Sequence, residues 1–534
     1  MRREMLRRSV FRIFVFTTLM FIVCAPAFAQ SWRFGVMSDT QWTTPDDGKN
    51  PNSVAVGIID QINDQFIKAH VQFVIQVGDL TDNGTNPALD TRAQAAQALY
   101  NARIGFFPLR GNHESSQAAA QEFQLDFPQT QGKGRNIVGA RKFTSPSANL
   151  QGLSYSFTYR NAKFVLLDQF TRLDGTGSSS NETNNTNIAD QLGWIGSTLA
   201  DKRRDTHAFV FGHKNLIGQN HVDFLLGSDP SQNPAVQNSF IGTLQANGVR
   251  YYISGHDHTH HRSIVASPDG LSKVEQLIGA SDSSKFYIPA IPSNDEKYDT
   301  PRRETPIAQQ VNEVGYYIFT VDDSEVTVDY YAAVVNPTLV DGEYLLYATP
   351  TLTFVKQETF GYNLNGTQFV IPEGADYSTV HDGFWGTRAQ ILGGTNSSTM
   401  TDGSNRPLTK TVDLGWSSVP GAASNALTLL GMADLGNANT DSYALSLTYN
   451  PWQTHHERIA RGEFGVAVKD ARGKWINAVD QNSGGSKSFV LGPWNSSYGL
   501  GTYGVDPHTR TAWAVVNYNS EFAAAEFSGH CQKH

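Results

Sequence analysis

The chain has 534 residues, of which 39% are hydrophobic and 17% charged. These values are ordinary for a globular protein of two to four domains. Asp and Glu (50) outnumber Lys and Arg (41), so the net charge is −9 at pH 7. An acidic surface repels polyanions, and we therefore expect no large nucleic acid as a partner. Composition leaves the oligomeric state open.

The first 29 residues have the parts of a secretory signal peptide. A basic segment, MRREMLRR, precedes the apolar run VFRIFVFTTLMFIVC, and Ala27-Phe28-Ala29 has the small-x-small pattern of a cleavage site. A membrane anchor is the alternative, but the run is short for a span. We expect the mature protein to be exported, to the periplasm or beyond the cell, with no stable membrane span.

Residues 32–335 alternate between predicted strands and helices, which is typical of an α/β domain. We expect one helix over 53–70, with Ser53 as its N-cap, and a hairpin over 316–334 with Asp322 near its turn. Polar, Pro-rich residues 280–306 are a candidate wall of a site. Apolar strands are predicted over 33–38, 73–79, 106–112, 163–168, 207–213 and 249–256, and further helices over 88–102, from Ser115, and over 188–203.

The pattern changes in the second half of the chain. From about residue 376, short strands are separated by turns rich in Gly, Asn and Asp. This predicts an all-β, sandwich-like domain over 376–530, to which we assign no role. Residues 336–375 connect the two domains and could add strands to either. The expected fold class is an α/β domain followed by an all-β domain.

Residue types that bind metal ions follow five of the predicted strands. Taken singly, each has a plainer interpretation: Asp39 or Asp79 could cap a helix, and His213 could be a core histidine. Together they share one position, because the carboxyl ends of neighbouring strands converge on one crevice. Carboxylate, amide and imidazole groups suit hard to borderline divalent cations. The residues are Asp39, Gln41, Asp79, Asn112, His113, His213, His256 and His258.

The order of these motifs resembles the calcineurin-like metallophosphoesterase superfamily, in the branch with Asp-x-Gln as the first motif. The motifs are Ser-Asp-Thr-Gln, Gly-Asp-Leu-Thr-Asp, Gly-Asn-His-Glu, Gly-His and Gly-His-Asp-His. The resemblance covers residues 32–335 and implies a four-layer α/β sandwich with two metal ions. It implies that Asp79 bridges the two ions. Asp39, Gln41 and His258 would complete one site, and Asn112, His213 and His256 the other. Asp82 would steady the ligands through hydrogen bonds, and His113 would protonate the leaving oxygen.

The resemblance implies hydrolysis of small phosphomonoesters or phosphodiesters by a metal-activated hydroxide. A nucleotidase or a cyclic-nucleotide phosphodiesterase on the same fold is one alternative. A second is an inactive surface or binding protein that retains a relic phosphoesterase domain. Metal content and aryl phosphate hydrolysis would separate the active from the inactive reading.

Gln41 stands where most of the superfamily has histidine. Its amide oxygen is a neutral, hard donor, so the site would keep its ligand number while losing an imidazole. The candidate metals are Mn²⁺, Fe, Mg²⁺ and Zn²⁺. We expect Gln41 to favour Mn or Fe over Zn²⁺.

Overall fold

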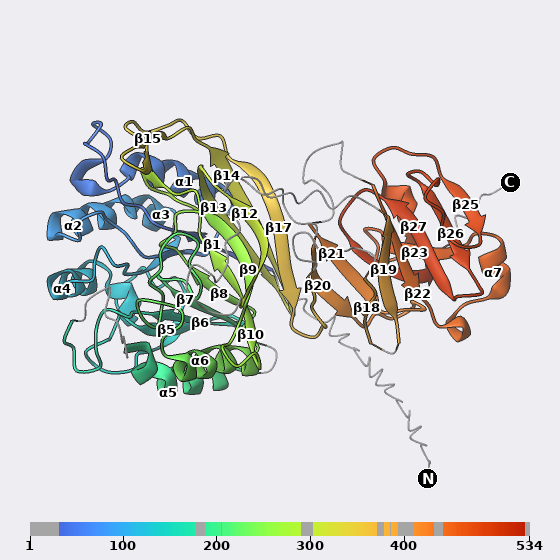
Figure 1. The fold of residues 1–534 in the computed structure, drawn as a ribbon, viewed down its shortest axis with the longest axis horizontal. Coiled ribbons are helices and arrows are strands. Elements are labelled where there is room, and N and C mark those ends of the chain that lie inside the picture. The colour runs from blue at the N-terminus through green and yellow to red at the C-terminus, as the bar shows by residue number, and fades with distance from the viewer. Residues whose placement is uncertain are drawn as a thin grey trace, which may run out of the picture.

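The computed structural model describes residues 31–177, 187–203, 206–289, 303–370, 379–384, 386–393, 411–431 and 442–528. The predicted signal peptide lies outside these residues, as does most of the polar stretch 175–187. Figure 1 shows an α/β region followed along the chain by an all-β region.

Two sheets form the centre of the α/β region. In the first, β1, β2 and β3 are parallel, β13 pairs antiparallel with β1, and β14 pairs antiparallel with β13. The first sheet has the order β17 (Val355–Asn363), β14 (Glu325–Val334), β13 (Glu313–Asp322), β1 (Trp32–Met37), β2 (Phe73–Val77) and β3 (Gly105–Leu109). The second has the order β12 (Glu304–Gln310), β9 (His260–Ala266), β10 (Lys273–Ile278), β8 (Tyr251–Ser254), β7 (His207–Gly212), β6 (Ala162–Leu167), β5 (Tyr155–Tyr159) and β4 (Arg141–Thr144).

The sheets face each other across an aromatic core. Phe34 of β1 stacks on Phe319 of β13, with ring centroids 4.6 Å apart, and meets Phe164 and Phe209 of the other sheet edge-on at 5.2 and 5.1 Å. All four rings are buried in one cluster. Offset and edge-on aromatic pairs add to the energy of burial, so this core holds the two sheets in fixed relation.

Helices cover both outer faces of the paired sheets. Isoleucines and Phe66 of one helix pack on the first sheet, and a separate apolar cluster lies under the helices of the second. The first group is α1 (Val56–Lys68), α2 (Asn86–Ala95), α3 (Gln97–Asn101) and α4 (Gln117–Asp126), and the second is α5 (Asn187–Ala200) and α6 (Pro234–Ala246). The layers are therefore helix, sheet, sheet and helix, as predicted.

The start of α1 differs from the prediction. The helix begins at Val56, and Ser53 lies in a preceding 3-10 turn with a left-handed φ of 59°. The Ser53 carbonyl instead accepts hydrogen bonds from the backbone N–H groups of Trp42 and Asp82 at 2.9 and 3.0 Å. Ser53 is not the N-cap, because this turn ties together the loops that follow β1 and β2.

The segment predicted as a connection supplies strands to the α/β region. β17 pairs with β14 along the edge of the first sheet. Two other strands, β15 (Thr338–Val340) and β16 (Glu343–Leu345), pair with each other and, through β16, with β11 (Lys285–Phe286). This small sheet thus joins part of the Pro-rich loop to the segment after residue 335.

Two further sheets form the all-β region. Apolar residues of both lie in one buried cluster, so they form a sandwich. One has the order β18 (His381–Asp382), β19 (Arg388–Gly393), β22 (Tyr443–Thr448), β27 (Thr511–Val516), β26 (Thr502–Asp506) and β25 (Ser488–Leu491). The other has the order β20 (Thr411–Ser417), β21 (Ala426–Leu430), β28 (Glu521–Glu526), β23 (Phe464–Lys469) and β24 (Trp475–Asn477), and one short helix, α7 (His456–Ala460), precedes β23. In the described part of the chain, no helix has the length and hydrophobicity needed to cross a bilayer.

Candidate metal centre

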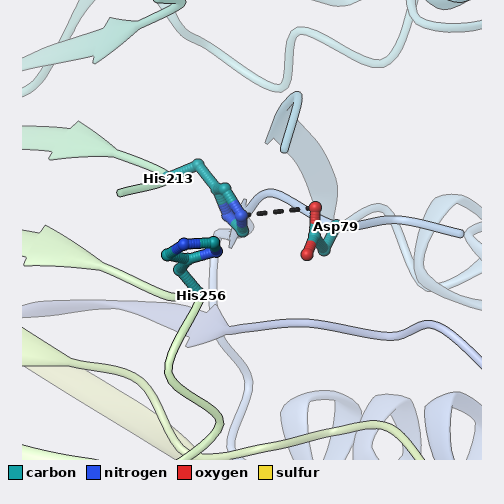
Figure 2. A group of neighbouring side chains, drawn as sticks. All are labelled: Asp79, His213 and His256. Atoms are coloured by element: carbon teal, nitrogen blue, oxygen red, sulfur yellow. Dashed lines mark ion pairs between the residues drawn. The ribbon is translucent and has the colours of Figure 1, made fainter. Parts of the chain in front are cut away.

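The predicted ligands come together at one edge of the two central sheets. They follow the carboxyl ends of β1, β2 and β3 in the first sheet and of β7 and β8 in the second. Figure 2 shows Asp79 facing His213 and His256 across the space between the sheets. Parallel strands with the same direction explain the meeting point, because all of their carboxyl ends open on the same crevice.

Asp79 is common to two groups of side chains that could hold a metal ion. One group is Asp79, His213 and His256, and the other is Asp39, Asp79 and His258, with ligand atoms within 4.8 Å of one another in each. All five residues are buried. A single carboxylate between two such groups matches the bridging position predicted for Asp79.

The imidazole of His213 is oriented for a cation. Its Nδ1 donates to the Val77 carbonyl at 2.9 Å, which leaves Nε2 facing two acceptors, Asn112 Oδ1 at 2.9 Å and Asp79 Oδ1 at 3.2 Å. Burial would lower the pKa of His213, but Asp79 outweighs it and raises that pKa to about 9. Nε2 and the two oxygens therefore surround a position where either a proton or a metal ion would bind all three atoms.

His256 is held by a carboxylate that the sequence did not reveal. Its Nε2 lies 3.2 Å from Asp223 Oδ1, while its backbone N–H donates to Asp39 Oδ1 at 3.0 Å. Burial and the neighbouring His221 lower the pKa of His256 to about 3, so its ring is neutral. A neutral ring with Nε2 engaged presents Nδ1 as its remaining donor of a lone pair.

Lys214 follows His213 at the end of β7, where a lysine side chain is ordinarily exposed. Its side chain is buried and pairs with Asp223. Asp223 therefore lies between the ammonium group and His256. Asp223 stands ten residues beyond His213, in a loop with no periodic pattern, so its position was not visible in the sequence.

His258 faces the other group of ligands. Its Nδ1 donates to the Lys285 carbonyl at 2.8 Å, and its Nε2 lies 3.7 Å from Asp39 Oδ1 and 3.2 Å from the Gln41 amide nitrogen. Burial lowers the pKa of His258, which favours the neutral ring that a metal requires.

Gln41 lies between Asp79 and His258, where the motif predicts a ligand. Its Nε2 donates to Asp79 Oδ2 at 3.1 Å, while its buried Oε1 has no hydrogen-bond partner. A half-turn of the carboxamide exchanges the two atoms and places the oxygen between the carboxylate and the imidazole. The unpartnered oxygen fits an amide that completes a cation site.

Two glycines allow the ligands to approach one another. A Cβ at Gly111 would lie 1.9 Å from Asp79 Oδ1, and one at Gly78 would lie 2.4 Å from His213 Nδ1. The backbone is also strained at three predicted ligands: Asp79, His256 and His258 have left-handed φ values of 42°, 73° and 53°. Such conformations cost about 1–3 kcal/mol each and persist where surrounding contacts hold them.

His113 lies at the mouth of the cluster. Its side chain is 31% exposed, its Nε2 lies 3.8 Å from Asp79 Oδ2, and its Nδ1 bonds the Asp82 carbonyl. Burial would lower the pKa of His113, but Asp79 and the Asp82 carbonyl outweigh it and raise that pKa. The Asp82 carboxylate is 3.5 Å from the same Nδ1, so Asp82 contacts the predicted acid rather than a predicted ligand.

A rim of aromatic and charged residues lies beside the ligands. His221 stacks on His256, with centroids 4.1 Å apart, and its Nδ1 bonds Asp257 at 2.8 Å. Tyr287 meets His221 and His258 edge-on at 5.0 and 5.3 Å. Tyr287 follows β11, so the Pro-rich loop does contribute to the wall of the crevice.

His260 and His261 follow the last motif directly in the sequence. Both are buried at the start of β9. His260 pairs with Glu358 of β17 at 3.1 Å, and His261 with Glu304 of β12 at 3.0 Å. They are strand residues: His261 joins β9 to its neighbour β12, and His260 joins β9 to β17 of the first sheet.

A family model, that of the calcineurin-like phosphoesterases, matches residues 33–260. The match covers less than half of the chain and places a calcineurin-like phosphoesterase domain across these residues. The matched residues include every predicted ligand and His113. The fold class is confirmed, a mixed α/β metallophosphoesterase domain with additional β-sheets in the C-terminal region. The roles of the individual site residues stay predictions. A search of curated proteins finds no match.

Several solved structures are similar to part of the chain. GAP50, the anchor in the inner membrane complex of Plasmodium, is 13% identical over 59% of this chain and 88% of its own, with a TM-score of 0.35. A dimetal phosphatase from Danio rerio is 17% identical over 56% of this chain and 95% of its own, with a TM-score of 0.34. The purple acid phosphatase PPD1 of yellow lupin is 16% identical over 57% of this chain and 51% of its own, with a TM-score of 0.38.

Proposed function

We propose that the chain is an exported phosphoesterase that hydrolyses small phosphomonoesters or phosphodiesters with two bound divalent cations. The observation that carries the proposal is the position of Asp79, whose carboxylate is shared by two groups of metal-capable side chains. The pattern of residues 1–29 supports export to the periplasm or beyond the cell.

The residues that would hold the cations divide into two sets around Asp79. Asp39, Gln41 and His258 would hold one cation, and Asn112, His213 and His256 the other. When bound, two such cations supply a nucleophilic water near neutral pH and neutralise charge on the phosphoryl group. Among the candidate metals we favour Mn or Fe, because Gln41 replaces an imidazole with a harder oxygen donor.

His113 is the proposed general acid. It is the most exposed of the predicted site residues that contact Asp79, and the Asp82 carbonyl fixes its ring through Nδ1. Nε2 therefore faces the crevice, where it can give a proton to the oxygen of the departing alcohol. Bond cleavage then releases an alcohol rather than an alkoxide.

Substrate choice would depend on the rim. Tyr287 and Lys285 come from the loop after the family match, and the Lys285 ammonium lies 5.1 Å from the Tyr287 ring centre and 2.5 Å from Glu343. An aromatic face beside a paired cation suits a small organic leaving group next to a phosphate. We expect small esters to be preferred over polymeric substrates.

The test is hydrolysis of mono-aryl and bis-aryl phosphates by the purified chain, with bound metal measured by mass spectrometry. We expect both metal and activity in the wild type. Asp79→Asn should lose activity by on the order of 1,000-fold or more, because it removes the charge shared by both cations. Asp64→Asn, an exposed residue on α1, is the matched control. Wild-type activity in Asp79→Asn, or a wild type with neither metal nor activity in added Mn²⁺, would overturn the proposal.

A further inference from the structure

A cavity of about 550 Å³ lies at the opposite end of the second central sheet from the candidate metal centre. It is formed by the edge strand β4, the turn between β5 and β6, and residues 201–203 and 206, which lie between α5 and β7. β7 begins at this cavity and ends beside His213. Six residues of strand span about 20 Å, so the two sites are separate.

The lining of the cavity is strongly basic. Among the lining residues that the structure describes, six are Lys or Arg and one is acidic, in a chain whose net charge is −9. Concentrating cations in one hollow of an acidic protein raises their mutual repulsion, which a bound anion would relieve. The basic residues are Arg141, Lys142, Arg160, Lys163, Lys202 and Arg203, and the acidic one is Asp201.

Lys163 makes the hollow more than a surface patch. Its side chain is 5% exposed, and its Nζ lies 3.8 Å from a carboxylate oxygen of Asp201, which is itself 67% exposed. Burial lowers the pKa of Lys163, and nearby Lys142 lowers it further, while Asp201 opposes both. A buried ammonium group with one long, exposed ion pair is incompletely neutralised.

The local backbone brings the flanking cations to the cavity. Lys142 lies in an irregular stretch of the β4–β5 pairing and has a left-handed φ of 54°. Arg160 occupies the tight turn between β5 and β6, also left-handed at 47°. Bulges and turns of this kind redirect side chains at a sheet edge. The guanidinium of Arg160 lies 5.8 Å from the Tyr159 ring centre, which limits its freedom.

We propose that this hollow binds a small anion with two or more linked phosphoryl groups. Guanidinium groups bind phosphoryl oxygens through paired hydrogen bonds, and ammonium groups add point charges, so the mixture suits a linear polyphosphate better than a carboxylate. The volume fits a compact ligand. Its lining comes from three short neighbouring segments, so we propose a small ligand rather than a nucleic-acid strand.

The test is calorimetric titration of the full chain with inorganic tripolyphosphate in the presence of EDTA, which empties the metal centre and prevents hydrolysis. We expect saturable binding that weakens at least tenfold in the double variant Lys142→Gln/Arg160→Gln. Lys68→Gln/Arg103→Gln removes two exposed cations elsewhere and should leave affinity unchanged. Orthophosphate and citrate should bind more weakly than tripolyphosphate.

Four results would overturn the proposal: no binding, equal loss in both double variants, no loss in the cavity variant, or equal affinity for citrate. Lys163→Met is a second variant with a separate readout. It should abolish binding while raising the melting temperature or leaving it unchanged, since it removes a buried charge. Because metal is absent throughout, these results do not depend on whether the chain is a phosphoesterase.

Discussion

The two β-rich regions of the molecule bury very different side chains. In the α/β region, aspartates, histidines, glutamates and arginines are buried around the strand ends and between the sheets. Among the described residues of the C-terminal sandwich, the buried polar groups are uncharged, as at Asn425, Asn477 and Asn517. Burying a charge costs free energy unless the charge is paired. The buried charges therefore mark the α/β region as the part of the molecule built for chemistry.

The largest expected effect is on catalysis, and it compares a histidine of the candidate site with an exposed histidine of the sandwich. His113→Asn should lower kcat by about 10²–10⁴-fold, since the leaving oxygen loses its proton donor. Bound metal should stay at the wild-type level, because His113 is not a predicted ligand. Steady-state kinetics and metal analysis measure the two effects. His508→Asn, at an exposed site of the sandwich, is the control, and equal kinetics for both variants would refute the assignment.

The next largest effect is on stability, and it tests whether buried charges matter more in the α/β region than exposed ones do in the sandwich. Glu358 of β17 accepts from Arg262 at 3.0 Å and from His260 at 3.1 Å, and all three residues are buried. Glu358→Gln removes one of the two carboxylates that pair with the buried guanidinium, the other being Glu275, and should lower the free energy of unfolding by about 3 kcal/mol. In the sandwich, Glu526→Gln removes a carboxylate that pairs with exposed His455 and should cost less than about 1 kcal/mol. Denaturant titration compares them, and equal losses would contradict the contrast between the regions.

A smaller effect concerns acid stability. His207 starts β7, where its Nδ1 lies 3.0 Å from the Tyr362 hydroxyl and its Nε2 2.8 Å from the Asp323 carbonyl. Burial lowers the pKa of His207 to about 4. The unfolded chain then binds the proton first as pH falls below about 6.5, so stability is lost from there toward pH 4.

This titration should cost about 2 kcal/mol between pH 7 and pH 4.5. Thermal unfolding of wild type and His207→Gln across this range measures it. The difference in melting temperature between the two proteins should shrink on acidification. A constant difference would show that His207 takes up no proton on unfolding.

The smallest effect concerns the choice of metal. Gln41→His replaces a hard amide oxygen with an imidazole and should raise activity with Zn²⁺ or Co²⁺ relative to Mn²⁺, by about tenfold or less. Assays of the apo-protein reconstituted with each metal give the ratio. Gln61→His, on α1, is a matched control. An unchanged ratio in Gln41→His would refute a ligand role that tunes metal preference.

The sequence predicted the parts of the site that lie next to strands. Asp79, Asn112 and His213 follow apolar strands directly, so strand order and the common direction of the ends place them together. It did not predict Asp223, which reaches His256 from a loop. The burial of Lys214 depends on the same loop, so no local pattern in the sequence indicates it. The domain boundaries and the role of each ligand stay predictions, as does export.

The fold was predictable where periodicity is strong and less so where two distant segments meet. The hairpin around Asp322 and the layers of the α/β domain follow from local pattern. The pairing of Arg262 with Glu358 joins residues almost one hundred positions apart, and no local pattern encodes it. At Ser53 a local pattern misled the prediction. Serine is a favourable N-cap residue, but here it lies in a turn that ties two loops together.

The pairing of β17 with β14 determines how short a functional fragment of this chain can be. The family match ends at residue 260, and the alternating pattern of strands and helices ends near 335, yet β17 runs to Asn363. A fragment cut at 335 would leave the whole length of β14 as a bare edge, and such edges recruit strands from other molecules. It would also remove Glu358, one of the two carboxylates that pair with Arg262. Expression trials should therefore extend past residue 363, since shorter fragments would precipitate even with every predicted ligand present.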